Sequence, residues 1–335
     1  MNKICKFILT LVLGLLIVSC NGSDDSSTVK KRDYTEQYTK DLDSIEEFLQ
    51  THYMEVVDHA GFPDDQDVVF TLIPAGGSQV SVWNQTEYPL QERNVEQNDI
   101  TYKIYYLKFR NGVGEKPCNV DGVYTNYKGS LLNGTVFDQT TNPQSLFQLE
   151  GVIKGWSEIF PQFASGTYSS NIDGTVSYNN FGAGVMFLPS GLGYYNIAQS
   201  TIPAYSPLIF NIKLFEVKRL DQDADGISSY LEDLNGDGYM YLLKEDVINP
   251  DDTDGDNFPD YLDLDDDGDL VLTRTERVQY IDPVTDEKFY YSFDGAAVND
   301  PLTPFDETQG IPNCGTTPDY TTPTRLRKYR DATCQ

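Results

Sequence analysis

The spacing of apolar and polar residues predicts several regular elements along the chain. Apolar side chains recur at helical spacing over residues 35–53, which predicts an amphipathic helix. We expect this helix to pack against its own domain; a dimerisation or client-binding helix is the alternative. Residues 68–73 and the tyrosine-rich residues 101–110 are typical of strands. Residues 208–214 alternate apolar and polar side chains, which predicts a strand with one buried face.

The first apolar run lies at the N-terminus, where residues 7–19 follow a short basic stretch and precede Cys20. The run is too short for a comfortable membrane span and fits the apolar region of a signal peptide. Residues 17–20, Ile-Val-Ser-Cys, resemble the bacterial lipobox, whose cysteine is lipidated after cleavage. An ordinary signal peptide with an incidental cysteine is the alternative. We expect residues 1–19 to be a signal peptide and residues 20–33 to be lipidated Cys20 with a flexible polar tether.

A second apolar stretch leads into a short predicted helix in the middle of the chain. Val152 and Ile153 precede Lys154 and Gly155, and apolar residues then recur at helical spacing from Trp156. The pattern places Trp156 in the first turn, with its ring on the apolar face. For an isolated tryptophan, core packing is the commoner role.

The surroundings of Trp156 change that interpretation. Residues 127–138, YKGSLLNGTVFD, resemble the Y-x-G-x-L-x-x-G-x-x-F-D signature of the FKBP-type peptidyl-prolyl cis-trans isomerases. Residues 147–156, FQLEGVIKGW, resemble that family's F-x-L-x-x-V-I-x-G-W segment, and residues 188–194, LPSGLGY, its I-P-x-x-L-x-Y segment. Residues 202–214 resemble its closing I-P and L-x-F-x-V-x-L strand. Four blocks in the right order form a specific match, although each alone would be weak.

The resemblance implies an α+β fold for residues 99–220, an FKBP-like antiparallel sheet wrapped around one short helix. It also implies a pocket with Trp156 as the floor for a proline ring. Tyr194 would donate its hydroxyl to the peptide, and Asp138 would lie beside the twisting amide. The resemblance implies further walls and rims for this pocket, with the Ile153 N–H facing a substrate carbonyl: Tyr127, Phe137, Phe210, Val152, Ile153 and Ile202.

Such a pocket implies a peptidyl-prolyl cis-trans isomerase that acts on proline-containing polypeptide clients among exported proteins. The reaction breaks no bond and needs neither a nucleophile nor a cofactor. His52 and His59 are the only histidines and lie in no recognisable catalytic context, which disfavours a triad hydrolase or a zinc enzyme. The alternative is an FKBP fold kept as a non-catalytic chaperone or surface binding module.

The sequence departs from the family pattern at several places near the implied pocket. Tyr195 stands where the family usually has glycine, and the arginine expected after Asp138 is missing. Residues 166–184 look like an insertion, and the loop at residues 196–201 is shorter than usual. Because loops near a site carry specificity, these departures bear on substrate preference more than on fold.

The formal net charge of −28 is concentrated in one part of the chain. Residues 221–269 contain 18 acidic residues and one lysine, a net charge of −17. A disordered acidic linker is one explanation. However, residues 221–232 match the calcium-loop pattern D-x-D-x-D-G-x5-E completely. This loop would offer three carboxylates, a backbone carbonyl and a bidentate glutamate: Asp221, Asp223, Asp225, Ile227 and Glu232.

Two further acidic arrays follow, and a partial fourth begins at Asp233. One array comprises Asp252, Asp254, Asp256, Asp260 and Asp263, and the other comprises Asp265, Asp267, Asp269 and Glu276. Together the arrays resemble thrombospondin type 3-like calcium repeats. We therefore expect residues 221–277 to be an irregular acidic repeat region that binds structural Ca²⁺; Mg²⁺ fits less well because it retains more water.

Two segments carry no recognised motif. Residues 34–98 form an N-terminal helix and strand region, and residues 278–335 form a tail with basic residues near its end. We expect the tail to dock onto the acidic repeats, because a chain of this charge disfavours nucleic acid as a partner. In an exported protein Cys314 and Cys334 can form a disulfide, which leaves Cys118 free.

The expected location follows from the N-terminus. A lipidated Cys20 would anchor the protein to the membrane of the cell envelope, at the outer membrane and on its periplasmic or surface side. Residues 23–25, Ser-Asp-Asp, resemble the acidic export signals of Bacteroidetes-type surface lipoproteins.

Overall fold

The structure is a computed structural model that describes residues 31–59, 62–141, 143, 145–296, 303–305 and 309–334. The expected signal peptide and Cys20 lie outside the described residues. Within the described ranges, no helix has the length and apolar character needed to cross a membrane.

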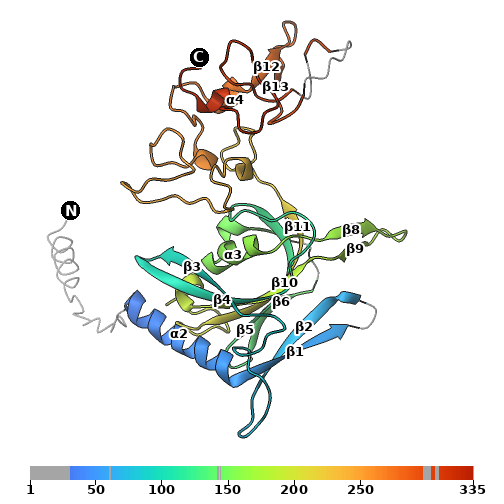
Figure 1. The fold of residues 1–335 in the computed structure, drawn as a ribbon, viewed down its shortest axis with the longest axis vertical. Coiled ribbons are helices and arrows are strands. Elements are labelled where there is room, and N and C mark those ends of the chain that lie inside the picture. The colour runs from blue at the N-terminus through green and yellow to red at the C-terminus, as the bar shows by residue number, and fades with distance from the viewer. Residues whose placement is uncertain are drawn as a thin grey trace, which may run out of the picture. The chain divides into compact units, whose positions relative to one another are not determined.

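A seven-stranded antiparallel sheet is the centre of the fold (Figure 1). Its strand order is β3-β4-β10-β11-β5-β6, and β7 also pairs with β5. The predicted antiparallel sheet is confirmed, and it includes β3, which precedes residue 99. The strands are β3 (Gln91–Gln97), β4 (Ile100–Arg110), β5 (Gly122–Leu131), β6 (Val136–Thr140), β7 (Leu146–Gln148), β10 (Gly182–Leu188) and β11 (Leu208–Lys218).

The sheet buries apolar residues on both faces. On one face Met186 and Phe210 pack with Trp156 of α3 (Lys154–Ile159), the short helix that the sequence predicts. On the other face Phe187 and Ile209 pack against a second cluster. That cluster comes from α2 (Tyr34–Thr51), β1 (His52–His59) and β2 (Phe62–Leu72), and includes Ile45, Phe48, Leu49 and Val68.

The prediction of one buried face for residues 208–214 is wrong. All of these side chains are buried, including Asn211 and Lys213, which are 7% and 8% exposed. The alternation predicted a solvent-facing side, but α2 and the β1–β2 hairpin cover it. Lys213 reaches Asp67 of β2 at 3.3 Å, so its charge is paired.

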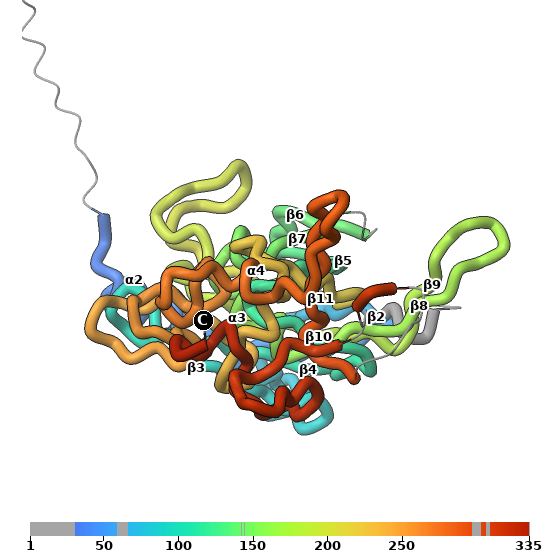
Figure 2. The backbone as a smooth tube through the Cα atoms, turned by 90° about the horizontal axis from the view of Figure 1, so that it is seen from above, coloured from blue at the N-terminus to red at the C-terminus, as the bar shows by residue number. Residues whose placement is uncertain are grey.

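The predicted insertion at residues 166–184 has two structural parts. β8 (Thr167–Ser170) and β9 (Val176–Asn179) form a separate antiparallel hairpin. In Figures 1 and 2 this hairpin projects from the sheet. The last three residues of the range, from Gly182, already belong to the central strand β10.

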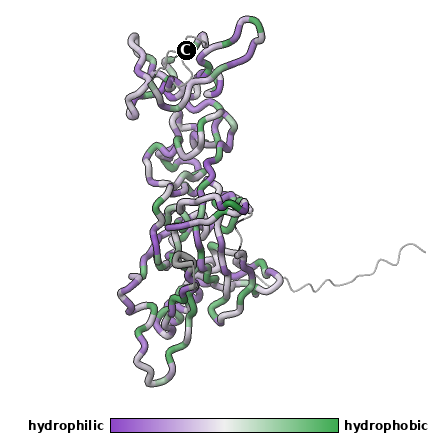
Figure 3. The backbone as a smooth tube through the Cα atoms, turned by 90° about the vertical axis from the view of Figure 1, so that its right-hand side faces the viewer, coloured by the Kyte–Doolittle hydropathy of each residue, from purple (hydrophilic) through white to green (hydrophobic). Residues whose placement is uncertain are grey.

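The acidic region consists of loops punctuated by very short helices, η4 (Ser229–Leu231), η5 (Asp260–Leu262) and α4 (Thr273–Glu276). Figure 3 shows hydrophobic positions more often around the sheet than in these loops. The region packs on the sheet domain: the Asn119 side chain donates to the Met240 carbonyl at 2.7 Å and accepts from the Met240 N–H at 2.9 Å.

The C-terminal tail contains the hairpin β12 (Val278–Ile281) and β13 (Lys288–Tyr290) and the short helix η6 (Lys328–Arg330). Of its basic residues, Arg330 contacts the acidic region, with its Nε 3.1 Å from Thr253 Oγ1. Arg325 and Arg327 instead pair with Asp294 of the tail itself.

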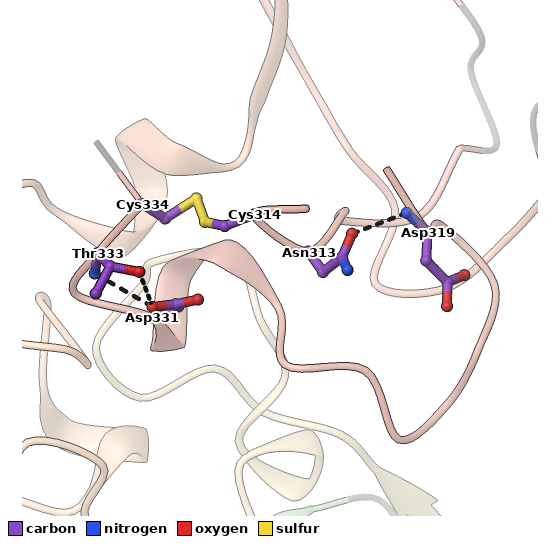
Figure 4. Close-up of a disulfide and its surroundings, with 6 residues drawn as sticks. All are labelled: Asn313, Cys314, Asp319, Asp331, Thr333 and Cys334. Atoms are coloured by element: carbon purple, nitrogen blue, oxygen red, sulfur yellow. Dashed lines mark hydrogen bonds between the residues drawn. A yellow bond between two sulfur atoms is a disulfide. The ribbon is translucent and has the colours of Figure 1, made fainter. Parts of the chain in front are cut away.

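The cysteine pairing expected from the sequence is confirmed. Cys314 and Cys334 form a disulfide with their Cα atoms 5.5 Å apart (Figure 4). Cys118 is free and buried, and its burial raises the pKa of the thiol.

Three 3-10 turns, η1 (Leu149–Gly151), η2 (Phe160–Gln162) and η3 (Ser190–Leu192), complete the sheet domain. Helix α2 is tied to η3 by a buried carboxylate. Asp41 Oδ2 accepts hydrogen bonds from the Ser190 N–H at 2.8 Å and the Ser190 hydroxyl at 2.6 Å.

We predict that Asp41→Ala lowers the free energy of unfolding by about 3 kcal/mol, because it leaves three buried donors, two on Ser190 and one on Gln37, without a charged acceptor. Chemical denaturation measures the change. Asp43→Ala, at an exposed position of the same helix, should stay within about 0.5 kcal/mol of the parent. Equal effects of the two substitutions would contradict this role of Asp41.

Candidate active site and metal sites

A cavity of about 510 Å³ opens on the α3 side of the sheet. All nine residues that the resemblance implies for the pocket line it. They come from β5, β6, β11, the segment that leads into and begins α3, and the connection between β10 and β11: Tyr127, Phe137, Asp138, Val152, Ile153, Trp156, Tyr194, Ile202 and Phe210.

Trp156 is held edge-to-face by neighbouring rings at the base of this cavity. It is 4% exposed, and its ring centroid lies 5.0 Å from Tyr127, 5.5 Å from Phe147 and 5.4 Å from Phe210. Edge-to-face pairs favour these separations and restrict the ring to one orientation. Gly155 allows α3 to approach β10, because an added Cβ would lie 2.5 Å from Leu188 Cδ1.

The ionisable groups of the cavity are two tyrosines and one aspartate. Tyr127 donates its hydroxyl to Asp138 Oδ2 at 2.6 Å across the β5–β6 pair. Burial, together with the Asp138 charge, raises the pKa of Tyr127 and that of Tyr194. Both phenols therefore remain protonated at neutral pH. Among the described residues the Tyr194 hydroxyl has no hydrogen-bond partner, so it is available to a ligand.

The backbone at Gly129 and at Tyr195 helps to shape the walls of the Trp156 cavity. An added Cβ at Gly129 would lie 2.4 Å from Phe137 Cε2 and 3.0 Å from Phe210 Cε1, so only glycine admits both rings. Tyr195 adopts a left-handed φ of 49°, which explains why glycine is common at this position. Its ring stacks on Tyr34 of α2 at 4.4 Å, a contact that a glycine would lack.

Sequence reasoning did not assign five cavity-lining residues. Phe147 stands within a recognised motif block, which is a signal that could have identified it. The others belong to turns without periodicity, where no pattern marks them: Gly151, Gln199, Ser200 and Thr201.

Sequence reasoning also missed the polar network behind α3. The Glu158 side chain is fully buried and accepts from Arg93 at 2.7 Å and Tyr241 at 2.9 Å, while Lys154 pairs with it at 2.7 Å. The Glu158 carbonyl accepts from the Tyr239 hydroxyl at 2.8 Å. Arg93 lies on β3 and the two tyrosines lie in the acidic region, so the network joins three parts of the chain.

Sequence comparisons identify a known family in this part of the chain. Residues 114–215 match the sequence model of the family described as FKBP-type peptidyl-prolyl cis-trans isomerase. This region is an FKBP-type domain. Residues 222–305 match a second family, described as BamM C-terminal.

Several relatives resemble the FKBP-type domain. FkpA of Escherichia coli (strain K12) is 32% identical over 117 residues, which cover 34% of this chain and 38% of FkpA. Peptidyl-prolyl cis-trans isomerase Mip of Coxiella burnetii is 30% identical over 125 residues, 36% of this chain and 46% of Mip. The chain thus spans less than half the length of either relative. A crystal structure of a peptidyl-prolyl cis-trans isomerase from Pseudomonas syringae is 29% identical, with a TM-score of 0.29, covering 35% of this chain and 76% of that one.

Beyond the FKBP-type domain, the acidic region gathers three groups of carboxylates. In each group one oxygen per residue lies within 4.8 Å of those of the other members. The groups are Asp223, Asp225, Glu232 and Asp266; Asp252, Asp254 and Asp256; and Asp265, Asp267 and Asp269. Asp266, which the spacing did not select, stands in the first group in place of Asp221. Asp221 accepts from the Gly226 N–H at 3.0 Å, and the Ile227 N–H donates to Asp225 Oδ1 at 2.6 Å.

The first group is the most deeply buried. Glu232 is fully buried and Asp225 and Asp266 are each 1% exposed. Neither oxygen of Glu232 or Asp266 has a hydrogen-bond partner among the described residues. Burial and the neighbouring carboxylates raise the pKa of Glu232 to about 11, that of Asp266 to about 10 and that of Asp223 to about 8. Such a site must be neutralised, either by protons or by a cation that the free oxygens can bind.

Two other predicted calcium ligands, Glu276 and Asp263, lie outside the three carboxylate groups. Glu276 is 6% exposed with both oxygens unpartnered, and burial and Asp267 raise its pKa to about 8. Asp263 lies outside the second group, although burial and the charge of Asp256 raise its pKa.

We predict that Gly129→Ala weakens binding of a short Xaa-Pro peptide at least about tenfold, because the new methyl group displaces Phe137 or Phe210. A chemical-shift titration measures the dissociation constant. Gly151→Ala is the matched control, since Gly151 also lines the cavity but an added Cβ there meets nothing within 4 Å. Unchanged binding in Gly129→Ala would show that these rings do not contact the ligand.

Proposed function

We propose that the FKBP-type domain catalyses cis-trans rotation about Xaa-Pro bonds in polypeptide clients. The observation that carries the proposal is the composition of the cavity around Trp156. An apolar, aromatic floor stands beside an available phenol, Tyr194, and a carboxylate, Asp138. Nothing in this arrangement requires a cofactor.

The arrangement suits the chemistry of the reaction. Rotation of the amide has a barrier of about 18–20 kcal/mol, because the planar form gains resonance energy. The planar amide is also charge-separated, so water stabilises it more than the twisted form. An apolar cavity removes that solvation and favours the twisted transition state. Roughly 4–8 kcal/mol of such stabilisation gives a thousandfold to millionfold acceleration.

Two independent lines support the proposal. The relatives FkpA and Mip are both named as peptidyl-prolyl cis-trans isomerases. Nine of the residues that line the cavity are those that the family resemblance specifies. The alternative, a binding module without catalysis, would use the same cavity but leave the rate of rotation unchanged.

We predict that Tyr194→Phe and Asp138→Ala each lower kcat/KM for a short Xaa-Pro peptide by about tenfold or more, because each removes a polar contact to the twisting amide. A protease-coupled assay measures the rate. Asp173→Ala, in the exposed β8–β9 hairpin, is the control and should match the parent. Variants as active as the parent would remove these two residues from the proposed mechanism.

We also propose that the acidic region binds structural Ca²⁺. Support comes from the unpartnered, buried oxygens of Glu232 and Asp266 and from the all-carboxylate ligand set, which suits Ca²⁺ better than Mg²⁺. The first group would bind most tightly, because its carboxylates are the most deeply buried. The groups at residues 252–256 and 265–269 would be further sites.

We predict that millimolar Ca²⁺ raises the melting temperature of the full chain by several degrees, since about 100 times the dissociation constant adds about 2.7 kcal/mol. Asp266→Asn and Glu232→Gln should each reduce the shift. Glu245→Gln, an equal charge change at an exposed position of the same region, should retain it. A melting temperature that responds to neither Ca²⁺ nor a chelator would contradict the site.

We propose finally that Cys20 carries a lipid anchor in the cell envelope. The lipobox-like sequence at residues 17–20 supports this, and a relative from Legionella longbeachae, 32% identical over 111 residues, is named outer membrane protein MIP. Clients would then be exported polypeptides.

We predict that cells expressing the chain incorporate labelled palmitate into it, and that Cys20→Ser abolishes both the label and sedimentation with membranes. Cys118→Ser should change neither, because Cys118 is buried in the folded protein. Label that persists after Cys20→Ser would exclude this anchor.

A further inference from the structure

A second cavity, of about 570 Å³, adjoins the first. Val152 lines both, so the turn that carries Val152 forms the wall between them. The second cavity is bounded by Lys154 and Ser157 of α3, by β3, and by residues 240–243 of the acidic region. It therefore exists only because the acidic region packs on the FKBP-type domain.

The edge of strand β3 faces this cavity. Five consecutive residues, 93–97, line it. Side chains of a strand point alternately to opposite faces, so a continuous run of lining residues means that the strand's edge borders the space. β3 is the outermost strand of the sheet and pairs only with β4. In the described part of the chain, no backbone group of residues 91–97 bonds to anything beyond that pairing.

Most of the remaining lining is apolar, and few of its charges are unpaired. Apolar side chains come from both parts of the chain: Val95, Val120, Met240, Leu242 and Tyr261. The two cations, Arg93 and Lys154, are both paired with the buried Glu158. Glu96 and Glu150 also line the cavity, and neither forms an ion pair with any described residue. The free charge is thus negative and disfavours an acidic ligand.

We propose that this cavity binds the client segment next to the proline, as an extended strand added to the edge of β3. The proposal rests on the proposed function, because the same client would place its proline on Trp156 and cross Val152 into the second cavity. The segment is a polypeptide with apolar or basic side chains and few acidic ones. Leu242, 58% exposed, would cover it from the acidic region.

Main-chain pairing suits a catalyst that acts on many clients. Backbone hydrogen bonds to an edge strand give affinity that does not depend on the client's side chains. The apolar lining adds a small preference for apolar client side chains. The acidic region would thereby form half of the client-binding surface, and its contacts to Asn119 and Glu158 would hold that half in place.

The test compares two substrates of the full chain. One is a four-residue Xaa-Pro peptide, which can fill only the first cavity. The other carries the same core with six apolar or neutral residues added before it and six after it. The parent should turn over the extended peptide with about tenfold higher kcat/KM, the gain expected from one or two net hydrogen bonds. Leu242→Asp should abolish this gain and leave the short peptide unaffected. Leu326→Asp, at a similarly exposed leucine of the tail, should retain it.

Hydrogen exchange tests the strand pairing itself. The extended peptide should slow exchange of alternate backbone amides in β3, and the short peptide should not. Equal turnover of both peptides with no protection in β3 would overturn the proposal. If the parent does not accelerate rotation in even the short peptide, the proposed catalysis is wrong. The hydrogen-exchange measurement then tests the strand pairing separately: protection of β3 by the extended peptide supports it, and no protection overturns it.

Discussion

The buried carboxylate of Glu158 is the interaction on which the arrangement of the whole site depends. It lies on the helix that carries Trp156, and its partners are Arg93 on β3 and Tyr241 in the acidic region. A carboxylate without solvent contact is stable only when fully paired, and breaking such a pair costs about 3–5 kcal/mol. The network therefore fixes α3 relative to both neighbouring parts of the chain.

That constraint extends to both cavities. With α3 fixed, Trp156 stands where Tyr127 and Phe210 hold its ring, and the first cavity takes its shape. The same contacts hold residues 239–243 against β3 and create the second cavity. The acidic region is thus part of the surface beside the candidate active site, and its stability bears on that surface. The stability of the acidic region depends on protons or a cation that neutralise its buried carboxylates, because their oxygens have no hydrogen-bond partner among the described residues.

The sequence was sufficient to predict the features that short-range patterns encode. The residues around Trp156 were predicted because they occupy fixed places in motif blocks, and adjacent strands bring those blocks together. Asp223, Asp225 and Glu232 of the first calcium-type loop come together as their spacing predicts, because their ligand types recur within twelve positions. Contacts between distant segments were not predictable in this way. Asp266 joins Glu232 only when the loops fold onto each other, and Tyr241 reaches Glu158 across 83 positions. The second buried face of β11 likewise depends on where α2 packs.

We propose that the Trp156 cavity accelerates rotation about the Xaa-Pro bond and does not merely bind proline. Two-dimensional exchange spectroscopy measures the cis-trans exchange rate of a short Xaa-Pro peptide directly, without a coupling protease. With a catalytic amount of the full chain, we predict exchange cross-peaks on the subsecond timescale, where the uncatalysed peptide needs tens of seconds or more. Peptide resonances that shift on binding while their exchange rate stays at the uncatalysed value would contradict it.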